Sequence, residues 1–154
     1  MKALVTILMA DDDEDDRLLA KDAFIESRIQ NKFLSVEDGV ELLDYLHRRN
    51  GFADLKTFPT PSLILLDLNM PRMDGREALA EIKSDPVLRR IPIIVFTTSS
   101  ALEDVEKSYD LGAASFISKP ETFASLVDFM KSLGGFWAEF VQFSDHTPAR
   151  EIRS

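Results

Sequence analysis

The most informative stretch of the sequence is Leu63-Ile64-Leu65-Leu66-Asp67-Leu68-Asn69-Met70-Pro71. Four large apolar residues in succession are typical of a strand that is buried on both faces of a parallel sheet. The carboxylate of Asp67 would then lie at the carboxyl end of that strand. In open parallel sheets, ligands bind outside the carboxyl ends of the strands. The stretch therefore predicts a carboxylate that is fixed in place and open to chemistry.

Three further apolar runs also end in polar residues. They are Leu4–Met9 before Asp11-Asp12, Ile93–Phe96 before Thr97-Thr98, and Ala114–Ile117 before Ser118-Lys119-Pro120. The carboxyl ends of parallel strands meet at one edge of a sheet. Polar groups at four such ends favour a functional site over an ordinary surface.

Strand-like and helix-like patterns alternate along the whole chain. The predicted strands are 4–9, 33–36, 63–66, 92–96 and 114–117, and the predicted helices are 15–27, 39–49, 75–83, 102–111 and 123–133. The first helix carries an apolar stripe of Leu18, Leu19, Ala23 and Phe24. This alternation predicts an α/β fold, a doubly wound (βα)5 flavodoxin-like domain with a parallel five-stranded sheet in the order 2-1-3-4-5.

The composition excludes several classes of protein. The chain has 154 residues, of which 45% are apolar, and its net charge is −9. It is long enough for one globular domain, and its charge argues against nucleic-acid or anionic-membrane binding through a basic patch. No apolar run approaches the ~20 residues that span a bilayer. The absence of cysteine excludes disulfides and thiolate metal sites and fits a cytoplasmic protein.

Three carboxylates, those of Asp11, Asp12 and Asp67, converge in the predicted crevice. They would repel one another unless a cation joins them, and hard oxygen ligands select Mg²⁺ or Mn²⁺. Runs of acidic residues are also common as solvated helix starts, where they interact well with the helix dipole. We interpret Asp13, Glu14, Asp15 and Asp16 in this second way. We exclude Asp12 from it because Asp12 adjoins a strand end beside Asp67.

Thr97 and Lys119 each allow two interpretations. A threonine at a strand end often bonds to its own backbone, and most lysines lie on the surface. In the shared crevice, however, a hydroxyl and an ammonium can bind an anion held at Asp67. A carboxylate, a hard cation, a hydroxyl and an ammonium together are what phosphoryl transfer to a carboxylate requires.

These residues make the chain resemble the receiver domain of two-component response regulators. The matching positions, in the expected order, are Asp11-Asp12, the stretch from Leu66 to Gly75 that contains Asp67, Thr97, and Lys119-Pro120. The match covers about residues 4–133 and depends on the whole set of motifs. The resemblance implies phosphorylation of Asp67 by a sensor histidine kinase.

The resemblance also implies roles for the neighbouring residues. Asp12, Asp67 and the Asn69 carbonyl oxygen would bind Mg²⁺, with Asp11 acting through water. Thr97 and Lys119 would contact the phosphoryl oxygens. Phe116 stands where the family has a rotating aromatic switch residue, often tyrosine, and it lacks the hydroxyl. The Lys119-Pro120 bond is cis in many receivers.

We assign residues 1–133 to the receiver domain and residues 134–154 to an aromatic extension and polar tail. That extension is shorter than the roughly 50 residues that an output domain needs. It carries five large apolar residues, Phe136, Trp137, Phe140, Val141 and Phe143. They either fold back on their own domain or form a partner surface, most simply in a homodimer.

A narrower resemblance concerns the partner kinase. The long loop Asn50–Ser62, the motif Leu68-Asn69-Met70-Pro71 and the ending Phe136-Trp137 resemble single-domain regulators that are paired with bacterial phytochrome kinases. We therefore expect the partner to be a sensor histidine kinase of the phytochrome type.

Two other functions compete with a phospho-acceptor. A phosphohydrolase can form an aspartyl-phosphate on a similar fold, but such enzymes usually have a second Asp two residues after the nucleophile as general acid. Here that position is Asn69. The complete set of carboxylates, Thr97 and Lys119 argues against a scaffold that works without phosphorylation. We expect a signalling protein rather than an enzyme, with only its own phosphorylation and slow autodephosphorylation.

Overall fold

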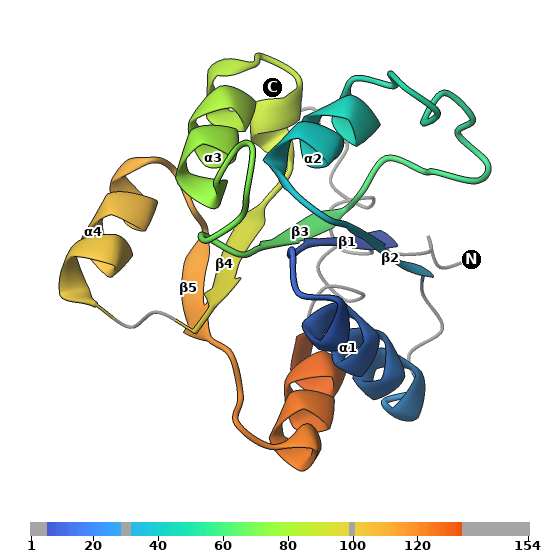
Figure 1. Ribbon diagram of the computed structural model, residues 1–154, viewed down its shortest axis with the longest axis vertical. Coiled ribbons are helices and arrows are strands. Elements are labelled where there is room, and N and C mark those ends of the chain that lie inside the picture. Colours follow the sequence, from blue (N-terminus) through green and yellow to red (C-terminus); the bar gives the residue numbers. More distant parts are fainter. Residues whose placement is uncertain (1–5, 29–31, 99–100, 134–154) are drawn as a thin grey trace, which may run out of the picture.

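The computed structural model describes residues 6–28, 32–98 and 101–133. In this part of the chain, strands and helices alternate as the sequence predicts (Figure 1). The elements are β1 (Thr6–Ala10), α1 (Glu14–Glu26), β2 (Lys32–Val36), α2 (Gly39–Leu46), β3 (Leu63–Leu66), α3 (Gly75–Ser84), the 3-10 helix η1 (Leu88–Arg90), β4 (Ile93–Thr97), α4 (Leu102–Asp110), β5 (Ser115–Ser118) and an unlabelled helix over residues 123–133.

The strands form one parallel sheet in the order β2-β1-β3-β4-β5, which confirms the predicted doubly wound topology. Its register aligns the ends of the three central strands. Ala10 of β1 pairs with Leu66 of β3, and Leu66 pairs with Val95 of β4. The residues that follow these positions therefore meet at one edge of the sheet.

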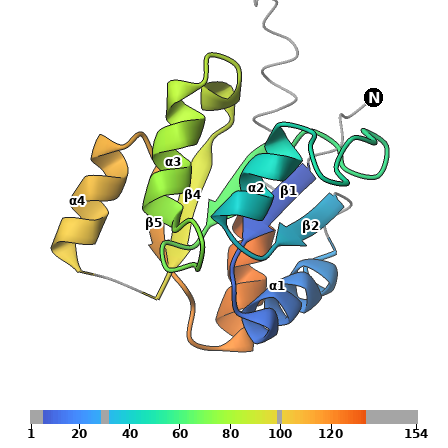
Figure 2. The same cartoon turned by 45° about the horizontal axis from the view of Figure 1, so that its top comes forward.

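Side chains alternate between the two faces of the sheet, and each face has its own apolar core. On one face, Leu8 and Ile64 pack with α2 and α3. On the other face, Ile7 and Leu65 pack with α1 and the helix of residues 123–133. Figure 2 shows α2, α3 and α4 on the first side and α1 with the orange helix on the second. The predicted layers of helices on both faces are thus observed.

Aspartates fix where the first three helices begin. Asp13, Asp38 and Asp74 are their N-caps, and each side chain accepts hydrogen bonds from backbone N–H groups of the first turn. In α3, Glu77 completes a capping box with Asp74. Because these caps follow strand-end loops closely, the helices start beside the carboxyl edge of the sheet.

The predicted apolar stripe of α1 is wrong in two residues. Leu18 is 58% exposed and Leu19 is 46% exposed. The buried face is made of Ala20, Ala23 and Phe24, which have helical spacing. Successive residues lie about 100° apart around a helix, so neither Leu18 nor Leu19 can share that face fully. The small side chains of the two alanines let α1 pack close to the sheet.

Most other predicted boundaries shift by a single residue, but α2 ends at Leu46 instead of Arg49. Arg48 has a left-handed backbone with φ 62°, which no α-helix continues through. The 3-10 helix Leu88–Arg90 was not predicted. Within the described residues no peptide bond is cis, so the Lys119-Pro120 bond is trans.

The predicted loop between α2 and β3 is confirmed, and it is built around one guanidinium. Arg48 donates hydrogen bonds to the carbonyl oxygens of Phe52 and Phe58 and, at 2.9 Å, to the hydroxyl of Thr60. It also lies 5.4 Å from the centre of the Tyr45 ring. We call these five residues the Arg48 cluster. It lies at the opposite end of the sheet from the strand-end carboxylates.

None of the helices formed by residues 6–28, 32–98 and 101–133 combines the length and the apolar character needed to span a bilayer. The extension 134–154, with its five apolar residues, lies outside the described residues.

Candidate functional site

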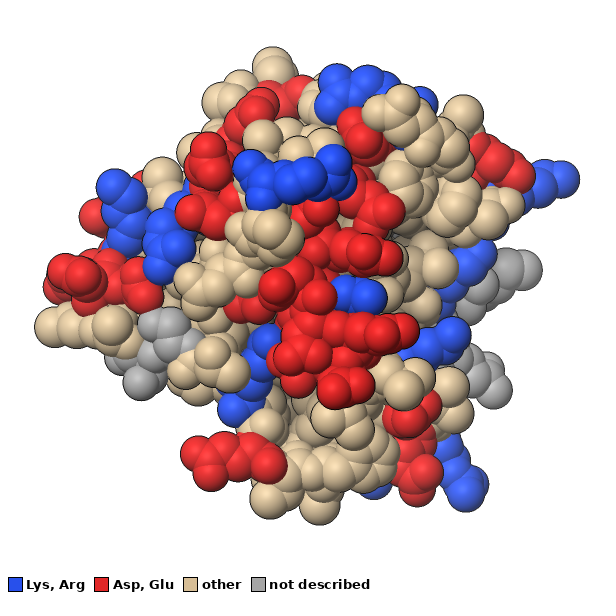
Figure 3. All heavy atoms as spheres, viewed as in Figure 1, with Lys and Arg blue, Asp and Glu red and all other residues tan. Residues whose placement is uncertain are grey.

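The ends of three neighbouring strands create the site. β1 leads into Asp11, β3 leads into Asp67, and β4 ends in Thr97. The backbone N–H of Asp67 donates to the carbonyl oxygen of Ala10 at 3.0 Å, which continues the parallel ladder beyond β3. On the surface, acidic side chains gather at the centre of the molecule over the start of α1 (Figure 3). The structure thus brings the predicted residues of β1, β3 and β4 together.

Asp67 is held in one orientation but is not sealed from solvent. It is 7% exposed. Its Oδ1 accepts a hydrogen bond of 2.7 Å from the hydroxyl of Thr97, which is fully buried. Its Oδ2 lies 3.6 Å from the ammonium nitrogen of Lys119. The backbone N–H of Asn69 lies 3.5 Å from Oδ1, at the limit of a hydrogen bond. A carboxylate fixed this way can be approached by an electrophile from its open side.

Lys119 lies closer to two other carboxylates than to Asp67. Its Nζ is 2.5 Å from Oδ2 of Asp11 and 2.8 Å from Oδ2 of Asp16, and its side chain is 12% exposed. Burial by itself lowers the pKa of Lys119, but the hydrogen bonds to Asp11 and Asp16 outweigh burial and raise this pKa above its usual value. Lys119 is therefore charged at any physiological pH.

Asp11 is the most deeply buried carboxyl group of the site. It is 0% exposed. Burial raises the pKa of Asp11 above its usual value, although Lys119 and the backbone N–H of Asp13 oppose the increase. Its carbonyl oxygen also accepts a hydrogen bond of 2.7 Å from Arg17. A buried carboxylate whose charge is costly gains from a nearby cation.

Three carboxylates fit a hard divalent cation. Oxygens of Asp11, Asp12 and Asp67 lie within 4.8 Å of one another. Asp12 is exposed and Asp67 is partly open, so a cation could reach the cluster from solvent. Donors that are all oxygens suit Mg²⁺ or Mn²⁺, and Mg²⁺ keeps several waters and so needs few protein ligands. The donor set therefore fits the cation that the sequence predicts.

The loop between β3 and α3, which carries Asn69, is fixed at its α3 end and in its middle. At its end, Gly75 approaches β3 so closely that an added Cβ would lie 2.2 Å from the Asp67 carbonyl oxygen. The N–H of Gly75 donates to the carbonyl oxygen of Leu68 at 2.9 Å. Only glycine fits there without displacing the backbone that holds the Asp67 carboxylate.

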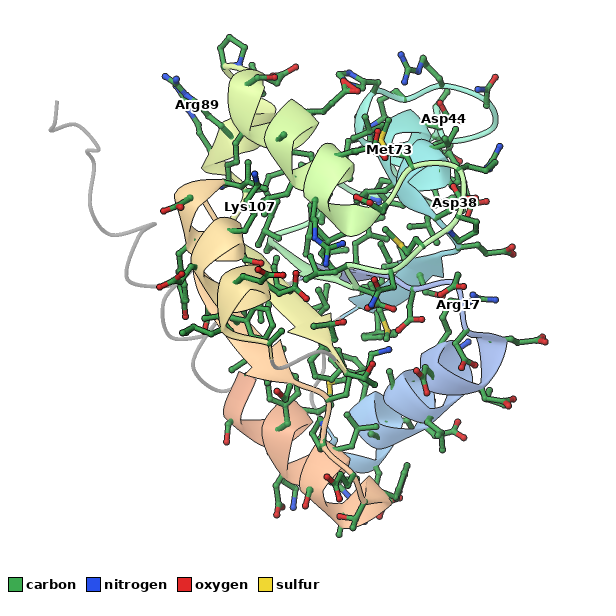
Figure 4. The ribbon with its side chains drawn as sticks, turned by 60° about the vertical axis from the view of Figure 1, so that its left-hand side comes forward. Arg17, Asp38, Asp44, Met73, Arg89 and Lys107 are labelled. Atoms are coloured by element: carbon green, nitrogen blue, oxygen red, sulfur yellow. The ribbon has the colours of Figure 1, made fainter. Side chains whose placement is uncertain are left out.

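The middle of the same loop is tied to the β2–α2 loop. Arg72 donates two hydrogen bonds, of 2.8 and 3.1 Å, to the Asp38 carboxylate. The N–H of Gly39 donates to the carbonyl oxygen of Met73 at 3.1 Å. Figure 4 shows Asp38 and Met73 where the two loops run together. Burial raises the pKa of Asp38, but the hydrogen bonds from the Arg72 guanidinium and the backbone N–H of Glu41 outweigh burial and hold this pKa below its usual value.

Phe116, the predicted switch residue, lies on β5 and is half-buried against the core on the α2–α3 side. Its backbone N–H donates a hydrogen bond of 3.2 Å to the hydroxyl of Tyr109 on α4. The edge strand is therefore linked to α4 at the residue whose ring the family resemblance marks as the switch. Thr97 adjoins it, because Phe96 and Thr97 pair with Ile117 and Ser118.

From the sequence, Asp16 was misinterpreted, and the Asp38–Arg72 pair and Tyr109 were not identified. Asp16 was interpreted as a solvated residue of the helix start, but it binds Lys119. No local signal marked it, because Asp16 looks like the other acidic residues of the first turn of α1 and its partner lies 103 residues away. Nothing in the pattern pointed to the Asp38–Arg72 pair or to Tyr109, because their partners come from distant segments.

Comparison with known proteins identifies the family of this chain. The family model of the response regulator receiver domain matches residues 7–131. Response regulator Rcp1 of Synechocystis sp. is 36% identical over 135 residues, which cover 88% of this chain and 90% of that protein. The Mn(2+)-bound form of Rcp1 has a TM-score of 0.76 with 36% identity and covers 88% of this chain and 95% of its own.

Two other solved structures are similar along most of their length. The phosphorylated cyanobacterial phytochrome response regulator RcpA has a TM-score of 0.79 with 39% identity and covers 88% of this chain and 94% of its own. Response regulator RPA3017, in red light signaling of R. palustris, has a TM-score of 0.81 with 36% identity, covering 87% and 94%. This chain therefore belongs to the family of response regulator receiver domains.

Proposed function

We propose that Asp67 is the residue on which this response regulator receiver accepts its phosphoryl group, and that the donor is a phosphohistidine of a sensor kinase. One observation carries the proposal: Asp67 is oriented by Thr97 on one oxygen, while its other oxygen faces Lys119. In the transfer, a carboxylate oxygen of Asp67 attacks phosphorus as the bond from phosphorus to the histidine nitrogen breaks. The electron pair of that bond stays on the nitrogen, and the histidine leaves as neutral imidazole because its other ring nitrogen is protonated or because the departing nitrogen takes a proton from solvent.

The neighbouring residues have separate tasks in this proposal. Thr97 and Lys119 donate hydrogen bonds to the oxygens of the transferred group, which stabilises the charge that accumulates there. Asp12, Asp67 and the Asn69 carbonyl oxygen would hold Mg²⁺ or Mn²⁺, with Asp11 contributing through water. A bound cation would neutralise the carboxylates that otherwise repel the incoming group. Support comes from the fit of the three carboxylates to a cation and from the Mn(2+)-bound form of Rcp1.

The signal would leave the site through Thr97 and Phe116. If Thr97 turns toward a phosphoryl group, it gives up its bond to Asp67, and space opens beside β5 for the ring of Phe116. Phe116 has no hydroxyl, so its new position would be stabilised by apolar packing alone. Its backbone bond to Tyr109 connects this movement to α4.

We infer that the protein is a signalling component and not an enzyme that turns over a substrate. A phosphohydrolase needs a general acid two residues after the nucleophile, and here that residue is Asn69. The similarity to response regulators along most of the chain also disfavours the phosphohydrolase. The cytoplasm is the compartment that fits a cysteine-free partner of a kinase.

The partner that we infer is a histidine kinase of the phytochrome type. Support comes from the similarity to RcpA and to RPA3017, which are linked by name to phytochrome or red light signalling. The acidic surface and the net charge of −9 continue to argue against nucleic acid as a partner.

Self-association as a homodimer is the remaining part of the proposal. An apolar groove is lined by Ile94, Ile117, Phe129 and Leu133, at the point where the described chain ends. The residues that follow carry five large apolar side chains within positions 136–143. We propose that this segment of a second copy covers the groove. Burial stabilises by roughly 25 cal/mol per Å², so a few aromatic residues could supply several kcal/mol.

Sedimentation tests the dimer. The intact chain should run as a dimer at tens of micromolar, and a chain truncated after Leu133 should run as a monomer. A matched control is a full-length chain with Phe123→Ser, which removes an exposed apolar residue away from the groove. If the intact and the truncated chain both run as monomers, with and without a phosphodonor, the extension covers only its own domain.

Labelling by a small phosphodonor such as acetyl phosphate tests Asp67. The Asp67→Asn variant should take up no phosphate in Mg²⁺ while keeping the unfolding midpoint of the wild type. The Asp54→Asn variant, which changes an exposed carboxylate far from the site, is the control and should label normally. Labelling retained in Asp67→Asn would refute the assignment.

A further inference from the structure

The ammonium of Lys119 makes its two short contacts with carboxylates other than Asp67, the proposed phosphoryl acceptor. It lies 2.5 Å from Asp11 and 2.8 Å from Asp16, but 3.6 Å from Asp67. An ammonium has three N–H donors, and each is directed at one acceptor. In this state two of them are used on Asp11 and Asp16, and the third is too far from Asp67 for a full hydrogen bond.

Asp16 differs from the other carboxylates of the site. It lies on the first turn of α1, and its side chain is 33% exposed. The cluster that fits a cation consists of Asp11, Asp12 and Asp67 and does not include Asp16. Its recorded side-chain bond in the site is the one to Lys119. Asp16 thus acts on the ammonium without belonging to the cation set.

Phosphorylation changes what competes for the ammonium. A phosphoryl group on Asp67 brings about two negative charges and three acceptor oxygens close to Lys119. Asp11 remains a partner because it is 0% exposed and water cannot replace the ammonium there. Asp16 is partly exposed and can be solvated by water instead. The bond between Asp16 and Lys119 is therefore the one that weakens when the ammonium turns to the phosphoryl group.

We propose that Asp16 is a positioning residue that holds Lys119 back from Asp67 and so limits how firmly the site retains a phosphoryl group. The inference rests on the proposed role of Asp67 as the acceptor. To bind the phosphoryl group fully, Lys119 has to break its ion pair with Asp16, and this costs free energy. A variant without the Asp16 charge avoids that cost and should favour the phosphorylated state.

Affinity for beryllofluoride in saturating Mg²⁺ measures this cost, because beryllofluoride binds a carboxylate reversibly in place of a phosphoryl group. Asp16→Asn keeps the size of the side chain but removes its charge. We expect it to bind beryllofluoride about fivefold more tightly than the wild type, the range of a partly exposed ion pair. Asp16→Glu keeps a carboxylate within reach of Lys119 and should restore the affinity of the wild type.

Two controls separate positioning from a general change in charge. Asp15→Asn removes the same charge from the neighbouring, exposed residue, whose side chain lies outside the cation cluster, and should change affinity by less than twofold. In a Lys119→Ala background, Asp16→Asn should have no more effect than Asp15→Asn, because the coupling between two residues vanishes when one of them is absent. Urea unfolding of each variant confirms that it is folded.

The outcomes distinguish two failures. If the wild type binds beryllofluoride and Asp67→Asn does not, but Asp16→Asn behaves like Asp15→Asn, the positioning role is wrong and the acceptor assignment stands. The same holds if Asp16→Asn has an equal effect with and without Lys119. If Asp67→Asn binds as well as the wild type, both the acceptor assignment and the positioning role are refuted.

Discussion

The two ends of the sheet each surround one cation with oxygen atoms, but with different kinds of oxygen. At the amino end, Arg48 is bound by backbone carbonyls and a hydroxyl, which are neutral. At the carboxyl end, Lys119 is surrounded by the carboxyl groups of Asp11, Asp16 and Asp67.

The difference separates a structural cluster from a functional one. The neutral acceptors around Arg48 hydrogen-bond its guanidinium and bring no negative charges that repel one another, so we expect the Arg48 cluster to contribute to stability. At the site, Asp12 adds a further carboxyl group, and one ammonium cannot neutralise them all. The remaining negative charge is a cost in the folded protein, and it is what a divalent cation relieves. The candidate functional site is thus the place where negative charge exceeds positive charge.

The largest expected effect on stability is at the amino end. Arg48→Ala should lower the free energy of unfolding by about 2 kcal/mol, because two partly buried carbonyls and an aromatic ring lose a charged partner. Phosphorylation of the folded variant should be normal. Urea denaturation and acetyl phosphate labelling check the two parts.

Arg49→Ala is the matched control for Arg48. It removes a neighbouring guanidinium whose side chain is 56% exposed and whose partner is Asp44. An exposed ion pair contributes about 0.5 kcal/mol. Equal losses in the two variants would mean that the Arg48 cluster has no special structural role.

At the carboxyl end of the sheet, removal of a carboxylate should affect cation binding more than stability. Asp12→Ala should weaken Mg²⁺ binding about tenfold or more, which corresponds to about 1.4 kcal/mol. Without Mg²⁺ its stability should equal or slightly exceed that of the wild type, since one repulsive charge is gone. Calorimetric titration with Mg²⁺ and urea denaturation in chelator measure both quantities.

Glu14→Ala provides the comparison for Asp12, because Glu14 is an exposed acid in the first turn of α1 outside the cation cluster. Its Mg²⁺ affinity should stay near that of the wild type. If Asp12→Ala and Glu14→Ala weaken Mg²⁺ equally, the effect is general electrostatics and Asp12 is not a ligand.

The smallest effect concerns pH, and the two ends should respond in opposite directions. Burial raises the pKa of Asp11 above that of the unfolded chain. Its contribution to stability is therefore present below the ordinary pKa of 3.8 and is lost as pH rises through the folded value. In the Arg48 loop, hydrogen bonds from the Lys56 N–H and the Thr57 hydroxyl lower the pKa of Asp54. The contribution of Asp54 is present above 3.8 and is lost as pH falls.

Stability measured from pH 3 to pH 7 in chelator, for the wild type and for Asp11→Asn and Asp54→Asn, checks these signs. Relative to Asp11→Asn, the wild type should lose stability as pH rises above 4. Relative to Asp54→Asn, it should lose stability as pH falls below 4. Slopes of the same sign would remove the contrast between the two ends.

The sequence by itself determined the topology and the strand-end residues. Four large apolar residues in succession, as in Leu63–Leu66, are typical of a strand buried on both faces, so the pattern alone located β3 and its last position. From the alternation of five strands with helices, the placement of Asp11, Asp67 and Thr97 at one edge follows, and the structure has them there. The aspartate caps of the first three helices are also local signals, although they were not used to predict these helices from the sequence.

Only the tertiary structure decided which partner each side chain has. The burial of Leu18 and Leu19 was predicted wrongly, because packing against the sheet depends on the small residues Ala20 and Ala23 and not on apolar character alone. Asp16 was read as solvated because its partner, Lys119, is distant in sequence. A local pattern shows which donor or acceptor groups a residue carries. Its hydrogen-bond partner often lies on a segment distant in sequence, so the pairing depends on how the strands and helices pack in the complete fold.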